Sequence, residues 1–343
     1  MIKKEQQGRL TDGTPVFSYT LSAGKMEAVI LSYGATLASF KVGATDVILG
    51  YDSFEGYVSG NSSQGATVGR YANRIARGAF DLHGKIYRLD ANEASTGCHI
   101  HGGVRGFSRC SWSLEELRDG EKPSLALTYA SPDGDQGYPG ALFVTVTFTL
   151  SECSLDISYR AETDRPTICN LTNHSYFNLA GEGDCLEHSL QLFADKWLPV
   201  DKSFIPVRIA SVKDTPFDFT LPKAIGCDIF AKDPQLEIVG GGYDHNFILS
   251  GDRSWKKAAV AFCPKTDITM TVSTDLPGVQ LYTSNMLDEP RGKNGMPLFK
   301  HQGFCLETQF WPDTPNHPDY PSCALEPGEV YETHTEFSFE AGD

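Results

Sequence analysis

The stretch Leu142–Leu150, LFVTVTFTL, decides the fold class. Every second residue in it is apolar and the others are mostly threonine, which is the period of a strand with one buried face. Apolar and polar residues alternate again over 155–160, and the intervening Ser-Glu-Cys-Ser at 151–154 is typical of a hairpin connection. These segments predict two adjacent antiparallel strands.

The same period continues along the chain, at Ile268, Met270 and Val272 and at Phe337 and Phe339. The sequence contains 33 glycines and 19 prolines, and no long segment has the 3.6-residue period of an amphipathic helix. Many strands between closely spaced turns predict an all-β fold, a large β-sandwich or barrel with few short helices. No linker-like segment interrupts the pattern, so we expect a single domain over residues 1–343.

Composition argues against several classes of partner. The chain carries 44 acidic and 29 basic residues, a net charge of −15, and no Lys/Arg cluster, so we expect no nucleic acid partner. No stretch approaches the roughly 18 apolar residues of a membrane span, and the polar N-terminal segment lacks the apolar core of a signal peptide. Nine scattered cysteines without a CxxC pair suggest reduced, buried thiols. We therefore expect a cytoplasmic protein without membrane contact.

Polar residues gather in five short clusters, at 69–78, 99–103, 170–181, 240–247 and 306–316. Loops and strand ends present such clusters to a pocket. In the first cluster, Asn73 and Arg74 can donate hydrogen bonds to sugar hydroxyls, and a solvated surface turn is the alternative.

The second cluster contains His99-Ile100-His101. In a strand, this spacing places both imidazoles on one face, which is compatible with metal ligation. A cupin-type metal site would need a nearby glutamate, but the first one afterwards is Glu115. We therefore expect no metal, and a structural histidine and a substrate-contacting His101 both remain open.

The remaining clusters supply candidate acid and base groups. His174 stands among amide, hydroxyl and aromatic side chains that are costly to bury without partners, which favours a ligand-facing surface. Asp244 follows three glycines and can accept hydrogen bonds from two vicinal hydroxyls, with a capped turn as the alternative. Glu307 follows Phe304, Cys305 and Leu306, and desolvation there raises its pKa towards a value suited to proton transfer.

Taken together, the clusters resemble the aldose 1-epimerase (galactose mutarotase) family over essentially the whole chain. The matching stretches are Gly-Arg-Tyr-Ala-Asn-Arg-Ile at 69–75, His-Gly-Gly at 101–103, Thr-Asn-His-Ser-Tyr-Phe-Asn-Leu at 172–179, Tyr-Asp-His-Asn-Phe at 243–247, Gly-Val-Gln-Leu-Tyr-Thr at 278–283, and Glu-Thr-Gln at 307–309. The resemblance implies an all-β supersandwich that binds a free aldose in an open cleft. It also implies interconversion of the α and β anomers of hexoses such as D-galactose and D-glucose, without a cofactor.

The resemblance also implies roles for individual residues. Glu307 would be the general base, His174 the general acid, and His101 would assist near the ring oxygen or the anomeric hydroxyl. The sugar would be held by Asn73, Arg74, Asp244 and Gln280, with Tyr282 flanking the pocket. The sequence departs from the family pattern at Phe310-Trp311, which puts the local pocket wall in question. We expect a monomer or a weak homodimer.

The chemistry requires one base and one acid. A cyclic hemiacetal opens when its anomeric hydroxyl loses a proton while its ring oxygen gains one, and each positioned group contributes on the order of 10²–10⁴-fold. To donate, His174 must be protonated when the sugar binds. We therefore expect nearby carboxylates such as Asp244 to favour the charged imidazole.

Three alternative functions remain open at this stage. A glycoside hydrolase or lyase would use Asp244 and Glu307 as paired carboxylates, but this leaves His174 unexplained. A non-catalytic sugar-binding protein would need no acid/base pair. An enzyme acting on hexose 6-phosphate would want an extra basic residue at the pocket, for which Arg74 and Arg77 are available.

Overall fold

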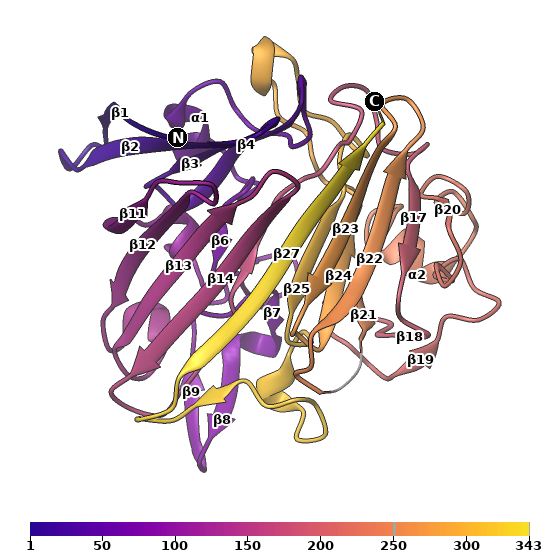
Figure 1. Ribbon diagram of the computed structural model, residues 1–343. Helices are drawn as coiled ribbons and strands as arrows, with labels where there is room; N and C mark the ends of the chain where they lie inside the picture. The colour runs from indigo at the N-terminus through magenta and orange to yellow at the C-terminus, as the bar shows by residue number, and fades with distance from the viewer. Residues whose placement is uncertain (250–251, 343) are drawn as a thin grey trace.

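The largest sheet of the protein has nine antiparallel strands and crosses the whole molecule (Figure 1). The computed structural model describes residues 1–249 and 252–342. The strand order is β11-β12-β13-β14-β27-β23-β22-β17-β20. In that order the strands span Ser113–Arg118, Ser124–Ser131, Leu142–Leu150, Ser154–Thr163, Tyr331–Ala341, Ile268–Thr274, Lys256–Cys263, Ser189–Leu192 and Lys223–Ala224. The strand nearest the C-terminus, β27, therefore joins the two halves of the sheet.

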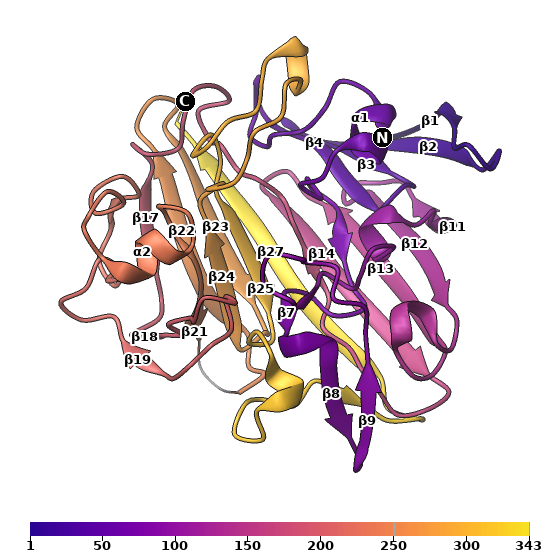
Figure 2. The same ribbon diagram turned by 180° about the vertical axis from the view of Figure 1, so that it is seen from behind.

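Two five-stranded sheets accompany this large sheet. The first, β1 to β5 in sequence order, spans Ile2–Arg9, Pro15–Ala23, Met26–Leu31, Thr36–Val42 and Thr45–Asp46. The second has the order β19-β18-β21-β24-β25, spanning Ala210–Ser211, Lys196–Trp197, Asp244–Ile248, Gly278–Tyr282 and Cys305–Gln309. From behind, β21, β24 and β25 lie in front of the nine-stranded sheet (Figure 2).

Short two-stranded pairs complete the β structure. They are β7 with β10 (Arg74–Ile75, His99–Ile100), β6 with β16 (Thr67–Val68, Thr172–Asn173), β8 with β9 (Ala79–Leu82, Lys85–Arg88) and β15 with β26 (Thr167–Ile168, Ala324–Leu325). The first, second and fourth of these pairs join mostly buried segments, whose backbone groups need partners, whereas β9 of the third pair is mostly exposed.

The alternation in the sequence places side chains as predicted. The alternate apolar residues of β13, from Leu142 to Leu150, are buried, whereas Phe143 on the other face is exposed. β13 pairs with β14 from Leu142 opposite Thr163 to Leu150 opposite Leu155. Ile268, Met270 and Val272 are also buried. The prediction of an all-β sandwich with few helices is confirmed.

The helices are short and lie outside the sheets. In the described part of the chain there are two α-helices, α1 (Phe54–Ser59) and α2 (Pro234–Ile238). Asp233 caps α2 by accepting a hydrogen bond from the Gln235 N–H, and Pro234 occupies the first turn, where its missing N–H costs nothing. Single 3-10 turns occur at Ala76–Gly78, Phe107–Arg109, Asp135–Gly137, Lys293–Gly295 and Thr314–Asn316. Over the residues described, no helix is long and apolar enough to cross a membrane.

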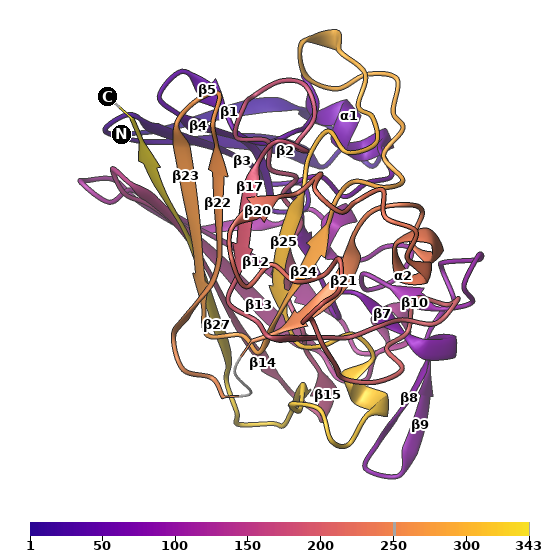
Figure 3. The same ribbon diagram turned by 90° about the vertical axis from the view of Figure 1, so that its right-hand side faces the viewer.

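The packing of two sheets against each other determines where the polar side chains of β25 point. In the side view, β21, β24 and β25 form a layer beside β22, β23 and β27 (Figure 3). Thr308 on β25 and Thr335 on β27 are linked by a hydrogen bond of 2.6 Å between their hydroxyls. Because side chains alternate along a strand, Cys305, Glu307 and Gln309 project from the opposite face of the smaller sheet.

All nine cysteines are free thiols, as expected from their spacing. Seven are buried, but Cys153 and Cys227 are exposed, so the expectation of burial is wrong for these two. Both lie in connections between elements, Cys153 in the β13–β14 turn and Cys227 after β20. Connections of this kind run over the surface, where a small side chain has no core to enter.

Candidate active site

A cavity of about 390 Å³ lies over the polar face of β21, β24 and β25, and its size suits a small organic ligand. Seven of the eight predicted site residues line it: Asn73, Arg74, His101, His174, Asp244, Tyr282 and Glu307. The eighth, Gln280, lies behind this lining and donates a hydrogen bond of 2.7 Å from Nε2 to Asp244 Oδ1. Gln280 is therefore placed to orient Asp244.

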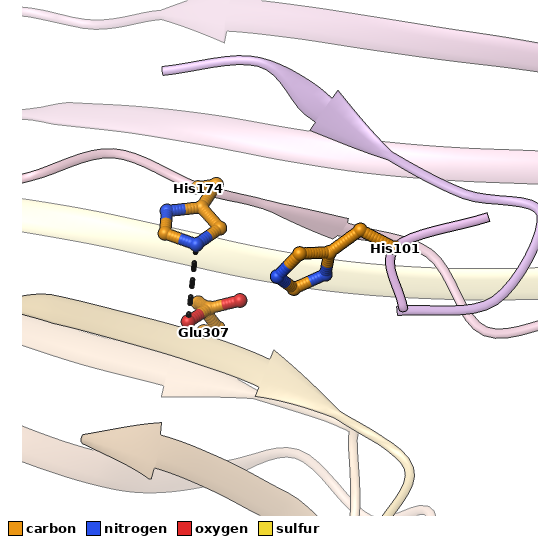
Figure 4. Close-up of side chains that lie close together, drawn as sticks. All are labelled: His101, His174 and Glu307. Carbon is orange, nitrogen blue, oxygen red and sulfur yellow. Dashed lines mark ion pairs between the residues drawn. The ribbon is translucent and has the colours of Figure 1, made fainter. Parts of the chain in front are cut away.

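His174 and Glu307 face each other in the cavity, with 3.7 Å between Nε2 and Oε1 (Figure 4). Both side chains are buried. Glu307 comes from the middle of β25, whereas His174 directly follows β16. The His174 backbone is fixed by hydrogen bonds of 3.0 Å to the carbonyl of Ala66 and 2.8 Å from the N–H of Gly65. Two segments distant in sequence thus hold a carboxylate and an imidazole at ion-pair distance.

Burial shifts both groups away from their ordinary ionisation. It raises the pKa of Glu307 to about 8; Asp244 adds to this increase and Arg74 opposes it. Burial lowers the pKa of His174 to about 4. The expectation that Asp244 favours a charged His174 is therefore wrong, because desolvation dominates and Asp244 is engaged by Gln280 and Arg74. Between these two pKa values the two side chains together carry one proton, and the order of the values places it on Glu307.

His101 stands beside this pair, with its ring centroid 5.3 Å from that of His174. Its Nδ1 accepts a hydrogen bond of 3.2 Å from the Asn73 backbone N–H, so the neutral ring carries its proton on Nε2. The backbone at His101 is left-handed, with φ of 53°, because the strand β10 has just ended. His101 thus offers an N–H donor to the cavity.

His99 does not share this face. Its Nδ1 lies 2.8 Å from the Asp90 carbonyl oxygen and its Nε2 lies 2.7 Å from the Tyr138 hydroxyl. The expectation that the two histidines project from one strand face is wrong, since His101 lies past the end of β10. His99 is a fully buried histidine whose two ring nitrogens are both engaged by the protein.

Three potential metal ligands come together here, because ligand atoms of His101, His174 and Glu307 lie within 4.8 Å of one another. A metal needs a nitrogen lone pair, but the His101 nitrogen that is not bonded to Asn73 carries the ring proton. The donor set therefore fits proton transfer and hydrogen bonding better than metal ligation.

Arg74, Asp244 and Asn73 form the polar wall beside the pair. Arg74 Nη1 lies 3.8 Å from Asp244 Oδ2, and burial raises the pKa of Asp244 although Arg74 opposes the shift. The Asn73 side-chain oxygen accepts a hydrogen bond of 2.9 Å from the Arg74 backbone N–H. Its amide nitrogen is then the group that Asn73 can offer to a sugar hydroxyl.

Aromatic rings enclose His174. Tyr176 stacks on its imidazole with centroids 5.0 Å apart, and Tyr282 approaches edge-on at 6.4 Å. Tyr176 was not predicted as a site residue, although it lies within the polar cluster at 170–181 that contains His174. Phe310 and Trp311 are buried but are not among the residues that line the cavity, so this departure from the family pattern does not alter the described wall.

Several buried polar atoms near Glu307 have no hydrogen-bond partner within the described protein. They are Glu307 Oε2, Gln280 Oε1 and both side-chain polar atoms of Asn246 and of Gln309. Asn246, Gln280 and Glu307 are direct neighbours across three strands, so their side chains share one face. Buried polar groups need partners, and a bound hydroxyl or water is the partner that this face can accept.

Comparisons with known proteins identify the family of the chain. The family model for aldose 1-epimerase matches residues 18–338. The galactose mutarotase of Bos taurus is 41% identical over 333 residues, covering 94% of each chain, and the aldose 1-epimerase of Escherichia coli (strain K12) is 38% identical over 341 residues, covering 96% of each. The solved structure of galactose 1-epimerase from Lactobacillus acidophilus NCFM has a TM-score of 0.89 at 30% identity, covering 100% of this chain and 99% of that one. The chain therefore belongs to the aldose 1-epimerase family.

Proposed function

We propose that this protein is a mutarotase that interconverts the α and β anomers of free hexoses such as D-galactose and D-glucose. The observation that carries the proposal is the buried Glu307–His174 pair, 3.7 Å apart across a cavity of sugar size. The galactose mutarotase and aldose 1-epimerase relatives support the same reaction.

The reaction follows from the single proton that the pair holds. With the proton on His174, the Glu307 carboxylate takes the proton of the C1 hydroxyl while His174 protonates the ring oxygen. The ring C–O bond breaks and leaves the open aldehyde. Rotation about C1–C2 presents the other carbonyl face, and the reverse transfers close the ring as the other anomer. The pair ends each cycle with the same proton, so no cofactor is needed.

The polar wall would hold the sugar during this exchange. The His101 Nε2–H is placed to donate to the ring oxygen or the anomeric hydroxyl, which stabilises charge that develops there. Asn73 and Arg74 supply donors, and Asp244, oriented by Gln280, supplies an acceptor for hydroxyl groups. The two tyrosine rings, Tyr176 and Tyr282, offer apolar surface to the ring carbons.

The charge of the cavity favours a neutral sugar over a phosphorylated one. Its lining contains one guanidinium, Arg74, and five acidic residues, Glu93, Asp244, Asp288, Glu289 and Glu307. Glu307 holds a proton at neutral pH, so the other four supply the negative charge. Arg74 is already paired with Glu93, and Arg77 is exposed and does not belong to the lining. Hexose 6-phosphate would therefore meet net repulsion.

The two other alternative functions, a hydrolase and a non-catalytic sugar-binding protein, explain the site less well. A hydrolase would use Asp244 as its second carboxylate, yet Asp244 is tied to Gln280 and lies beside Arg74. A binding protein would gain nothing from a buried glutamate whose pKa is raised beside an imidazole. We further propose a cytoplasmic, single-domain protein that acts as a monomer or a weak homodimer.

Exchange spectroscopy by proton NMR distinguishes these functions at equilibrium. With catalytic amounts of protein, the α and β anomeric protons of D-galactose should give exchange cross-peaks, while methyl β-D-galactoside should remain unchanged. Hydrolysis of the methyl glycoside without exchange on galactose would support the hydrolase instead. Binding without either effect would support a sugar-binding protein.

A further inference from the structure

Glu93 makes a two-point contact with Arg74 at the edge of the cavity. Arg74 Nε lies 2.8 Å from Glu93 Oε2, and Arg74 Nη2 lies 2.7 Å from Glu93 Oε1. Such parallel contacts fix the plane of a guanidinium as well as its position. They occupy Nε and Nη2, so Nη1 is the nitrogen that points to Asp244, at 3.8 Å.

The loop that carries Glu93 is tied to the strand that carries Arg74. The loop runs between β9 and β10, and the Asn92 side chain bonds both the N–H and the carbonyl of Ile100, at 2.8 and 3.0 Å. Ile100 in turn pairs directly with Arg74 across β10 and β7. The Thr96 hydroxyl donates to the Glu93 carboxylate, which restricts its rotation.

The other surroundings of Arg74 leave it dependent on this carboxylate. The Arg74 side chain is 7% exposed, and the Phe204 ring lies 4.6 Å from its guanidinium carbon. A buried guanidinium is costly without a hydrogen-bonded partner, and Asp244 at 3.8 Å is too far to hydrogen-bond. Glu93 therefore provides the hydrogen bonds that keep the Arg74 side chain in place.

We infer that Glu93 is a positioning residue for the proposed reaction: it holds Arg74 so that Nη1 faces Asp244 and the bound sugar. This inference rests on the proposed function. Glu93 acts through Arg74, so the cost of losing it should depend on Arg74 being present.

A pH effect separates this role from a general loosening of the loop. The groups that face Glu307 or act on it are His101, His174, Tyr176, Tyr282, Asp244, Cys305 and Arg74. Arg74 lowers the pKa of Glu307, so a displaced Arg74 lets that pKa rise. Glu93→Gln should therefore move the alkaline limb of the kcat/KM profile to higher pH, against the downward shift that loss of the Glu93 charge alone would cause. An alkaline limb that does not rise would contradict the inference.

A double-mutant cycle on kcat/KM tests the dependence directly. Glu93→Gln should lower kcat/KM for galactose by about 10- to 100-fold, as expected when a binding group is displaced by about an ångström. In the Arg74→Ala background, Glu93→Gln should not lower kcat/KM any further. If the fold-losses in kcat/KM of the two single variants multiply in the double variant, Glu93 acts independently of Arg74. Arg74→Lys replaces Arg74→Ala if the latter does not fold, since lysine cannot form the two-point contact.

A matched control and a structural readout complete the test. Glu27→Gln is the control, because Glu27 Oε1 forms an ion pair of 3.0 Å with Lys41 Nζ in the N-terminal sheet. This variant should leave kcat/KM unchanged. In a crystal structure of Glu93→Gln, the Arg74 guanidinium should have moved away from Asp244. An Arg74 that keeps its position would overturn the inference whatever the activity. Absence of turnover in the wild-type protein would instead overturn the proposed function.

Discussion

At the residue scale, Glu307 and His174 reverse the usual order of carboxyl and imidazole pKa values. Burial raises the pKa of Glu307 to about 8 and lowers that of His174 to about 4. Each side chain is thus destabilised in its charged form, so between these pKa values the pair carries one proton and no net charge. The order of these pKa values places that proton on Glu307 in the sugar-free protein, so the reactive form with a protonated His174 has to form when the sugar binds.

The pH dependence of turnover follows from that single proton. Below about pH 4 both groups are protonated, so Glu307 cannot accept the C1 hydroxyl proton. Above about pH 8 both are deprotonated, so His174 cannot protonate the ring oxygen. We predict a bell-shaped kcat/KM profile with limbs near these values, measured by polarimetry after subtraction of the uncatalysed rate. A rate still rising between pH 8 and 10 would contradict this assignment.

Replacing the proposed base should lower turnover without weakening sugar binding. Glu307→Gln keeps the size of the side chain but removes its basic oxygen, so turnover should fall by on the order of 10²–10⁴-fold or more. The dissociation constant for galactose, measured by calorimetry, should change little. Glu332→Gln, on the exposed part of β27, is the control and should behave as wild type. A near-wild-type rate in Glu307→Gln would exclude it as the base.

At the element scale, the turn after β10 determines where His101 points. Gly102 has φ of 81°, and a Cβ there would lie 1.8 Å from the Gly69 carbonyl oxygen. Gly84, in the β8–β9 turn, has a similar φ of 78° but nothing within 4 Å of such a Cβ. Comparing substitutions at the two positions therefore distinguishes the cost of a positive φ from the cost of a steric clash.

Alanine at these two positions should have unequal effects. Gly84→Ala bears the positive φ alone and should lose about 1 kcal/mol in the free energy of unfolding, measured in urea. Gly102→Ala adds a backbone clash, so it should lose at least about 2–3 kcal/mol and also reduce turnover, because His101 is displaced. Equal losses of unfolding free energy in the two variants would mean that the turn after β10 accommodates the methyl group without moving His101.

The long strands were predictable from sequence, whereas the short ones that position the site were not. β13 and β14 are long enough to show a period of two, and their burial follows it. β7, β10 and β16 have two residues each, too few for any period, yet they carry or adjoin Arg74, His101 and His174. The orientation of His99 away from His101 depends on where β10 ends, and composition does not encode that point.

The role of Glu93 and the charge state of His174 were also not predictable from the sequence. Glu93 lies in an ordinary polar loop, and its contact with Arg74 is visible only when β9, β10 and β7 are assembled. The pKa of His174 depends on how completely surrounding elements exclude water, which is a property of packing. Residue types and the family resemblance identified seven residues that line the cavity, but not the protonation states of His174 and Glu307.

At the scale of the whole molecule, the chain is acidic and so is its cavity. The net charge is −15, and the lining contains one arginine and four carboxylates besides the protonated Glu307. We predict that D-galacturonate has a kcat/KM at least about tenfold below that of D-galactose, with the difference narrowing as salt screens the repulsion. D-Fucose, which lacks only the 6-hydroxyl, controls for loss of that group. A galacturonate rate equal to that of galactose would contradict this charge discrimination.

The site also depends on the whole fold, because its residues come from distant parts of the chain. Asn73 and Arg74 lie near β7, His174 follows β16, and Glu307 lies on β25. One cluster of buried apolar side chains extends from Tyr19 to Phe339 and packs beneath these elements. The proposed catalytic pair therefore forms only once the sheets have assembled, and no single segment contains it.

Polarimetry on freshly dissolved α-D-galactose and α-D-glucose, with and without protein and in the presence of a chelator, tests the central claim most directly. Mutarotation by Glu307 and His174 predicts a faster approach to the unchanged equilibrium rotation, with a rate that the chelator does not alter. An unaccelerated approach with both sugars, or an acceleration that the chelator abolishes, would contradict a metal-free mutarotase.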